Sequence, residues 1–381
     1  MQRAVCSPHS RTKKKNKNRI NKTTVNIMKK TFILLLTAVL LAACSSNSGT
    51  SLLTPPSSGL AYEVLVVCDK NIWEGPTGRA LFGVLDSDVP AIPQSERSFR
   101  VSFTEPSGFT RLLKSFRNII EVKIDKSQFT QTKFKYHQDK YAAPQMIMTI
   151  QSPSADDALE YITKNSQVII DFFTSAEMNR ELQDLKEEKN HNTNFLDSVK
   201  KKFGCEMLIS KNIRSIKSGK DFLWASDISN NNSSIQNYVV YSYPYTSVDN
   251  FSRENFIQKR DSVMKINIPG NRPDRYMATD TMFVDVYDTE FHQRYMQVAK
   301  GLWQMENDMM GGPFVSHQVV DEKNNRVIVV ETFLYAPNKK KGDLIRKLEA
   351  ALFSLKLPAD KDIENSVHIP EVVIDDADIN E

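Results

Sequence analysis

The segment RVIVVETFLYAP, residues 326–337, followed by KKKGDLIRKLEAALFSL, residues 339–355, decides the fold class. Most residues of the first segment are apolar or β-branched, which predicts a buried strand. Pro337 ends that strand because proline cannot donate a hydrogen bond to a ladder. The second segment has the apolar spacing of an amphipathic helix. A strand, a proline turn and a helix therefore follow one another.

The same order recurs at Pro106, Pro153 and Pro244. After Pro153, Ser154 and Asp157 have the spacing of a capping box, which predicts a helix start. Between these units, residues 118–124 are expected to pair with 144–151, and residues 221–226 with 237–243, in the manner of hairpins. We predict an α+β fold of mostly antiparallel sheets with helices packed on one face, in two related halves built from strand-proline turn-helix units.

Two further helices are predicted near the middle of the chain, a long polar one from about 155 to 190 and a shorter one over 194–203. They are expected to end the first half, so the halves span residues 61–200 and 201–358. An acidic tail covers residues 359–381.

A helix is also predicted over residues 291–309. Its apolar residues are spaced four, three, four, three and four apart, and Gly311-Gly312-Pro313 would end it. The stripe consists of Phe291, Tyr295, Val298, Leu302, Met305 and Met309.

The N-terminal region is typical of an exported protein. Residues 28–44 read MKKTFILLLTAVLLAAC, with two lysines, an apolar run and small residues before Cys44. The apolar run is shorter than the roughly 20 residues that a membrane-spanning helix needs. We expect residues 1–27 to be a mis-assigned extension, residues 28–43 to be a lipoprotein signal peptide, and residues 44–60 to be the lipidated Cys44 and a flexible tether.

Charge is divided unevenly along the chain. The chain has 381 residues and a net charge of +4, yet its first 43 residues hold ten Lys or Arg and no acidic residue, so without them the net charge is −6. A nucleic-acid-binding surface needs basic residues on the folded part, so we do not expect nucleic acid as a partner. Cys68 and Cys205 adjoin apolar runs and are predicted to be free buried thiols, with a disulfide between them as the alternative.

Sequence motifs for catalysis, nucleotide binding or local zinc binding are missing. We therefore expect no cofactor and no metal site. The candidate ligand-site residues are Trp73, Arg117, Trp303 and His317, which an enzyme would bring together in one cleft. The alternatives are that Trp73 covers the core and that His317 is a hydrogen-bonded structural residue.

Several short motifs are spread along the chain. They are WEGPTG at 73–78, Pro93-Gln94, Arg117-Asn118-Ile119, Gly301-Leu302-Trp303 and Met310-Gly311-Gly312-Pro313-Phe314. With these motifs the chain resembles an uncharacterised Bacteroidota lipoprotein family, a domain of unknown function. The resemblance covers most of residues 62–357. It implies an exported, lipid-anchored protein and adds no mechanism.

We predict a lipid-anchored cell-envelope protein that acts as a non-enzymatic binding or assembly factor. Its anchor would place it on the outer membrane facing the periplasm, with the membrane and an envelope protein as partners. The alternatives are a periplasmic hydrolase or glycan-binding enzyme with dispersed site residues, and a small-molecule or lipid carrier with an apolar cavity. The sequence does not indicate the oligomeric state.

Overall fold

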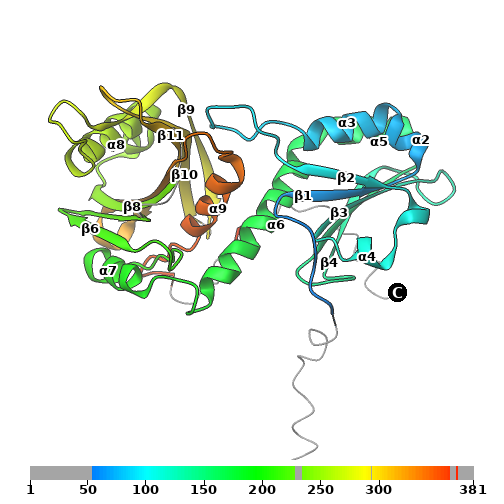
Figure 1. The fold of residues 1–381 in the computed structure, drawn as a ribbon, viewed down its shortest axis with the longest axis horizontal. Coiled ribbons are helices and arrows are strands. Elements are labelled where there is room, and N and C mark those ends of the chain that lie inside the picture. Colours follow the sequence, from blue (N-terminus) through cyan, green and yellow to red (C-terminus); the bar gives the residue numbers. More distant parts are fainter. Residues whose placement is uncertain (1–53, 228–233, 293, 361–365, 368–381) are drawn as a thin grey trace, which may run out of the picture. The chain divides into compact units, whose positions relative to one another are not determined.

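The computed structural model describes residues 54–227, 234–292, 294–360 and 366–367. Their strands form one five-stranded and one seven-stranded sheet, and helices pack against both (Figure 1). The predicted α+β class is confirmed. Cys44, the predicted signal peptide and most of the predicted acidic tail lie outside the described residues. No helix in the described part is both long and apolar enough to cross a membrane.

The five-stranded sheet has the order β2-β1-β3-β5-β4. The pairs β1–β2, β1–β3 and β3–β5 are parallel, and only β4–β5 is antiparallel. The expected hairpin between residues 118–124 and 144–151 is therefore wrong, because β3 and β5 run in the same direction. The strands are β1 (Glu63–Val67), β2 (Arg100–Thr104), β3 (Asn118–Ile124), β4 (Lys133–Gln138) and β5 (Met146–Ser152).

Helices cover this sheet unequally. α3, α5 and α6 pack their apolar residues on one face, whereas Leu113 of the short α4 packs on the other with neighbouring loop residues. Gly78 of α3 must be glycine because a Cβ atom there would lie 2.1 Å from the Trp73 carbonyl oxygen of α2. The elements are α2 (Lys70–Glu74), α3 (Pro76–Leu85), η1 (Pro106–Gly108), α4 (Arg111–Lys114), α5 (Ala155–Lys164) and α6 (Ser166–Lys186).

The seven-stranded sheet is antiparallel throughout, with the order β6-β7-β8-β12-β11-β10-β9. Both sheets taken together are thus mostly antiparallel, as predicted, and the β7–β8 hairpin is confirmed. The strands are β6 (Ser215–Gly219), β7 (Phe222–Ser226), β8 (Ile235–Pro244), β9 (Met277–Phe291), β10 (Arg294–Met305), β11 (Gly311–Asp321) and β12 (Arg326–Tyr335).

Helices pack on both faces of this sheet, not on one as predicted. α7 and α9 cover one face and α8 covers the other, because the central strands carry apolar side chains on both sides. The expectation that α7 ends the first half is also wrong, since Phe195, Val199 and Phe203 join the core of the second sheet. The elements are α7 (Thr193–Phe203), η2 (Val248–Phe251), α8 (Arg253–Asn267), η3 (Glu322–Asn324) and α9 (Gly342–Leu352).

The strand-proline-helix units are confirmed at all four prolines. β2, β5, β8 and β12 are followed by α4, α5, α8 and α9. Ser154 caps α5 as predicted, since its hydroxyl accepts a hydrogen bond from the Asp157 backbone N–H at 3.1 Å. The long helix expected from 155 to 190 is interrupted at Asn165 and forms α5 and α6.

The helix predicted over residues 291–309 does not exist. Those residues form the end of β9, the strand β10 and a turn. Buried side chains occur on both faces of β10, with Val298 in one core and Ala299 and Trp303 in the other. A strand buried on both faces lacks the simple alternation that would identify it, so its apolar residues matched a helical period.

Cys68 and Cys205, the two cysteines in the described part of the chain, are free and buried, which confirms the prediction. Burial raises the pKa of the Cys68 and Cys205 thiols to about 12. The end of the expected tether is not free, because Ser57 N–H donates to the Ala143 carbonyl at 3.0 Å and Ser58 N–H to the Ser115 carbonyl at 2.7 Å.

Candidate binding site

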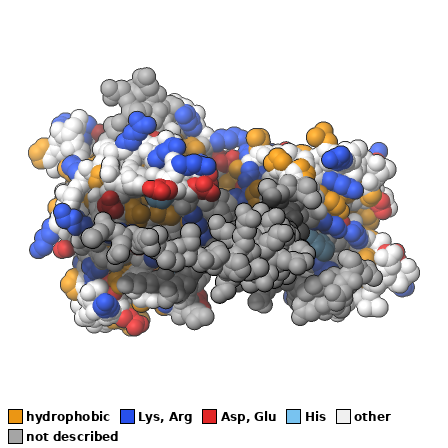
Figure 2. Space-filling model, turned by 90° about the horizontal axis from the view of Figure 1, so that it is seen from below, with side chains coloured by type: hydrophobic (Ala, Val, Ile, Leu, Met, Phe, Trp, Pro, Cys, Tyr) orange, Lys and Arg blue, Asp and Glu red, His pale blue; other side chains and the backbone are white. Residues whose placement is uncertain are grey.

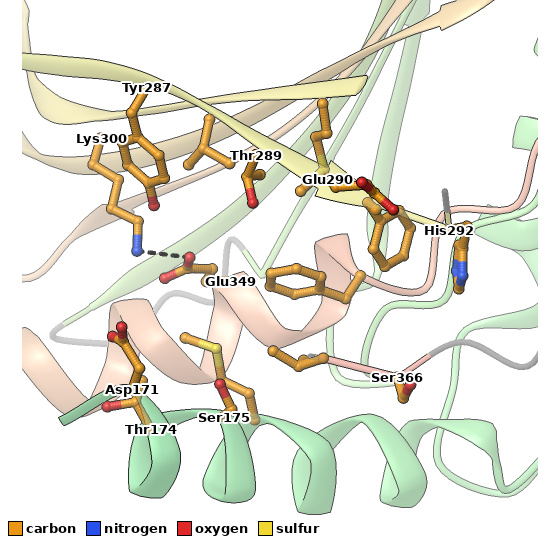
Figure 3. Close-up of a pocket in the computed structure, with 16 residues that line it drawn as sticks. Asp171, Thr174, Ser175, Tyr287, Thr289, Glu290, His292, Lys300, Glu349 and Ser366 are labelled. Atoms are coloured by element: carbon orange, nitrogen blue, oxygen red, sulfur yellow. Dashed lines mark ion pairs between the residues drawn. The ribbon is translucent and has the colours of Figure 1, made fainter. Parts of the chain in front are cut away.

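A groove lies between α6 on one side and β9, β10 and α9 on the other (Figure 3). It consists of two adjoining cavities of about 640 and 460 Å³. We call it the α6–β9 groove and define it by the residues that line both cavities. These are Asp171, Thr174, Met178, Tyr287, Lys300 and Glu349.

Regular spacing in each element directs these side chains to the groove. Thr174 and Ser175 lie three and four residues after Asp171 and four and three before Met178, so all four line one face of α6. Most groove-lining residues of the strands alternate, as side chains on one face of a sheet must. They are Tyr287, Thr289 and Phe291 of β9 and Met296, Val298 and Lys300 of β10. Glu290, next to the end of β9, lines the groove outside this alternation.

An ion pair occupies the centre of the groove. Lys300 Nζ of β10 lies 2.7 Å from Glu349 Oε1 of α9, and the two side chains are 19% and 5% exposed. Figure 3 shows the pair between the strands and α6. Burial alone would lower the pKa of Lys300, but the Glu349 carboxylate and the Tyr287 hydroxyl outweigh it and raise that pKa. Lys300 is therefore a fixed cation at neutral pH.

Tyr287 contributes its hydroxyl to the same cluster. The residue as a whole is 46% exposed, yet its hydroxyl end accepts a hydrogen bond from Lys300 inside the groove. Burial raises the pKa of this phenol, so it is neutral at physiological pH. Neither Lys300 nor Tyr287 is prepared to act as a base or a nucleophile.

The groove carries an excess of carboxylates. Five line its two cavities, against the two cations Lys300 and Arg346. Arg346 is already engaged, because its Nη2 donates to the Ser98 carbonyl at 2.9 Å and to Asp343 Oδ1 at 3.0 Å. Lys300 is paired with Glu349. The carboxylates are Asp88, Asp171, Asp285, Glu290 and Glu349.

His317 of β11 lies next to the groove without lining it. Its side chain is 1% exposed, and its ring centre is 4.7 Å from that of Phe353, which does line the groove. Burial, with a smaller effect of the Lys300 charge, lowers the pKa of His317 to about 3. The residue is thus neutral, and its Nε2 has no hydrogen-bond partner in the described structure.

The other three candidate residues lie elsewhere. Trp73 stacks on Phe103 with ring centres 4.9 Å apart, at the edge of the first core. Arg117 Nε lies 3.2 Å from Glu177 Oε1 of α6. Trp303 is 3% exposed and donates through Nε1 to the Leu334 carbonyl at 3.2 Å. The four residues are therefore not gathered in one cleft.

Among the described residues, no three His, Cys, Asp or Glu side chains come together in a group that could hold a metal ion. The α6–β9 groove was not predicted from the sequence. The signal that could have revealed it is the row of Asp171, Thr174, Ser175 and Met178 along one helix face.

Comparison with known proteins adds two family matches. Residues 192–354 match the family described as Domain of unknown function (DUF4837), and residues 57–186 match Domain of unknown function (DUF8532). Each half of the chain thus matches a family of unknown function. The gap between the matches falls between α6 and α7, before our predicted boundary at residue 200. Bacteroidota origin and lipid anchoring stay predictions.

No curated protein matches the chain. The chain is similar to two solved structures of Mog1, each at 6% sequence identity. A point mutant of Mog1 has a TM-score of 0.24, with 40% of this chain and 90% of that one covered. The Saccharomyces cerevisiae Ran-binding protein Mog1p has a TM-score of 0.25, with 41% and 92% covered. TM-scores this low do not establish a shared fold.

Proposed function

We propose that the protein is a lipid-anchored binding module of the cell envelope, and that its α6–β9 groove takes up a ligand with a basic group. The excess of carboxylates in the groove carries this proposal. Both lining cations are already paired with carboxylates, whereas Asp171, Asp285 and Glu290 offer negative charge to a ligand. Asp171 also accepts a hydrogen bond of 2.9 Å from the neutral Gln167 side chain, which leaves its charge uncompensated by that partner. An amine or guanidinium group has the matching charge and hydrogen-bond donors.

The ligand would also have a short apolar part. Met178, Phe291 and Phe353 line the groove beside the polar residues. Such a mixed lining is typical of sites in which apolar contact supplies affinity and a few polar groups fix orientation. It suits a lysine-like or arginine-like side chain better than a lipid, which is why we prefer a binding module to a lipid carrier.

The anchor in this proposal is Cys44. Its support is the sequence before it, in which Lys29 and Lys30 precede an apolar run and the small residues Ala42 and Ala43. Several acyl chains on one cysteine give stable membrane attachment, whereas one chain gives marginal attachment. We propose the periplasmic face of the outer membrane as the location and an envelope protein as the partner.

Binding explains the groove better than catalysis does. Lys300 is held protonated by Glu349, and the neutral His317 is buried behind the groove lining. The groups best placed for chemistry are thus committed to each other or shielded from a ligand. The dispersed-residue enzyme has no support, because its four residues lie apart.

The test is a substitution that fills the groove. Thr174 lies on the groove face of α6, and Thr174→Trp would place an indole in the cavity. We expect the full-length protein to bind a fluorescent trilysine peptide in an anisotropy assay, and Thr174→Trp to weaken binding at least about tenfold. Thr163→Trp, on an exposed part of α5, is the matched control and should bind like the wild type.

Two results would contradict the proposal, provided that all three proteins show the same circular dichroism and melting temperature. One is equal binding of trilysine by wild type and Thr174→Trp. The other is binding of triglutamate as tight as that of trilysine, because the acidic lining should repel it.

A further inference from the structure

The strand β9 forms an outer edge of the seven-stranded sheet. Within it, residues 285 and 287–290 are exposed and Val286 is half-buried. Apolar residues are exposed along the same strand, with Met282 at 81% and Phe283 at 55%. Edge strands offer unpaired backbone groups with which another strand can pair.

The register of β9 shows which of its backbone groups face outward. β9 and β10 pair without interruption from Val284 opposite Gly301 to Phe291 opposite Arg294. At the start of this paired stretch, the Val284 carbonyl accepts a hydrogen bond of 3.4 Å from Arg253 Nε of α8, so it points away from β10. Because backbone groups alternate along a strand, Val286 and Asp288 present their N–H and C=O groups away from β10.

Charge indicates what this edge can accept. β9 contains Asp280, Asp285, Asp288 and Glu290 and has no Lys or Arg. It also lacks proline, which with lysine commonly protects an exposed edge. Two copies of so acidic a strand would repel each other, so charge disfavours pairing between two copies of this chain and favours a basic strand.

We propose that an extended peptide segment with basic side chains adds to the sheet beside residues 286–290 of β9. This inference rests on the proposed function and names the ligand class as a peptide. The outward backbone groups would hold the peptide main chain. Alternate peptide side chains would then lie on the same face as Asp285 and Tyr287, which line the α6–β9 groove.

The probe is the octapeptide acetyl-(Lys-Val)4-amide, labelled for fluorescence anisotropy with the full-length protein. We expect it to bind more tightly than acetyl-(Glu-Val)4-amide. In two further peptides, either all Lys or all Val residues are N-methylated, which removes N–H donors on one edge only. One of these should lose at least about tenfold in affinity and the other should bind nearly as well as the parent.

Protein variants test the charge separately. The double substitution Asp285→Asn with Glu290→Gln should weaken binding of the octapeptide about tenfold. The control combines Glu160→Gln and Glu188→Gln, which remove the same charge from exposed positions outside the groove. Its binding should be unchanged.

The outcomes separate this inference from the proposed function. If trilysine binds but neither N-methylated peptide loses affinity, the groove takes a basic group and the strand-addition inference is wrong. Equal losses in both N-methylated peptides would also contradict it, because only one edge of the added peptide strand would hydrogen-bond to β9. If the wild type sediments as a dimer and binds no peptide, the edge accepts a second copy instead.

Discussion

His317 shows how burial changes the role of a single residue. It was a candidate base from its residue type, but the fold places it under Phe353 and beside the charge of Lys300. A protonated imidazole has no place there, since Nε2 has no acceptor within reach in the described structure. His317 is therefore a neutral core residue, and its burial in the unprotonated form lowers the free energy of unfolding at low pH.

This pH dependence of the free energy of unfolding can be measured. The unfolded histidine takes up a proton near pH 6.5, whereas the folded one does so only near pH 3. The unfolded state binds more protons between these values, so the free energy of unfolding falls as the pH is lowered from 6.5 toward 3. We expect His317 to account for a loss of about 2 kcal/mol between pH 6.5 and 5.

Urea denaturation at the two pH values checks this prediction. In His317→Leu, which keeps the volume and removes the titrating group, the pH-dependent loss should shrink by about that amount. An equal loss in wild type and variant would show that His317 is not the source.

Single residues were the least predictable part of the site. Trp73, Arg117, Trp303 and His317 were chosen because their side chains are chemically versatile. Their roles depend on neighbours distant in sequence, such as Glu177 for Arg117 and Leu334 for Trp303. Gly312 is a similar case. Its residue type predicts the end of a helix. In the structure it lies in β11, where a Cβ atom would stand 2.0 Å from the Leu334 carbonyl oxygen of β12.

At the scale of elements, α9 depends on a residue far away in the chain. The Glu96 carboxylate accepts hydrogen bonds from the backbone N–H groups of Lys341 at 2.7 Å and Gly342 at 2.9 Å. A carboxylate at this end satisfies free N–H groups and interacts favourably with the helix dipole. Glu96 therefore fixes the start of the helix that carries Glu349 into the groove.

We expect Glu96→Gln to lower the free energy of unfolding by about 1 kcal/mol, because a neutral amide is a weaker partner for the helix end. Urea denaturation measures the change. Glu105→Gln is the control, since Glu105 precedes η1 but its side chain caps no N–H group. If the two variants are equally stable, Glu96 does not support α9.

Elements with a local signal were predicted well. The four strand-proline-helix units depend on neighbouring residues, and Ser154 caps α5 as its spacing indicated. β10 was predicted as a helix because its apolar side chains serve two cores. The parallel pairing of β3 with β5 was missed because nothing local distinguishes it from a hairpin.

At the scale of the whole molecule, the groove is formed by elements whose proximity could not be predicted from the sequence. Asp171 of α6 and Glu349 of α9 are far apart in the chain, yet both line it. Lys and Arg side chains are spread over both sides of the face shown in Figure 2. The acidic groove therefore belongs to a molecule whose surface also carries many basic residues.

The decisive measurement is photocrosslinking in living cells with a benzophenone amino acid in place of Gln167 in the full-length protein. Gln167 is an exposed residue of α6 that lines the smaller cavity, so the probe reaches the groove without filling it. We expect this position to capture a molecule with basic side chains, position 163 to capture none, and Cys44→Ser to abolish the capture by releasing the protein from the membrane. Mass spectrometry identifies the captured molecule. Equal capture at both positions, or capture of an acidic molecule at position 167, would contradict the proposed function.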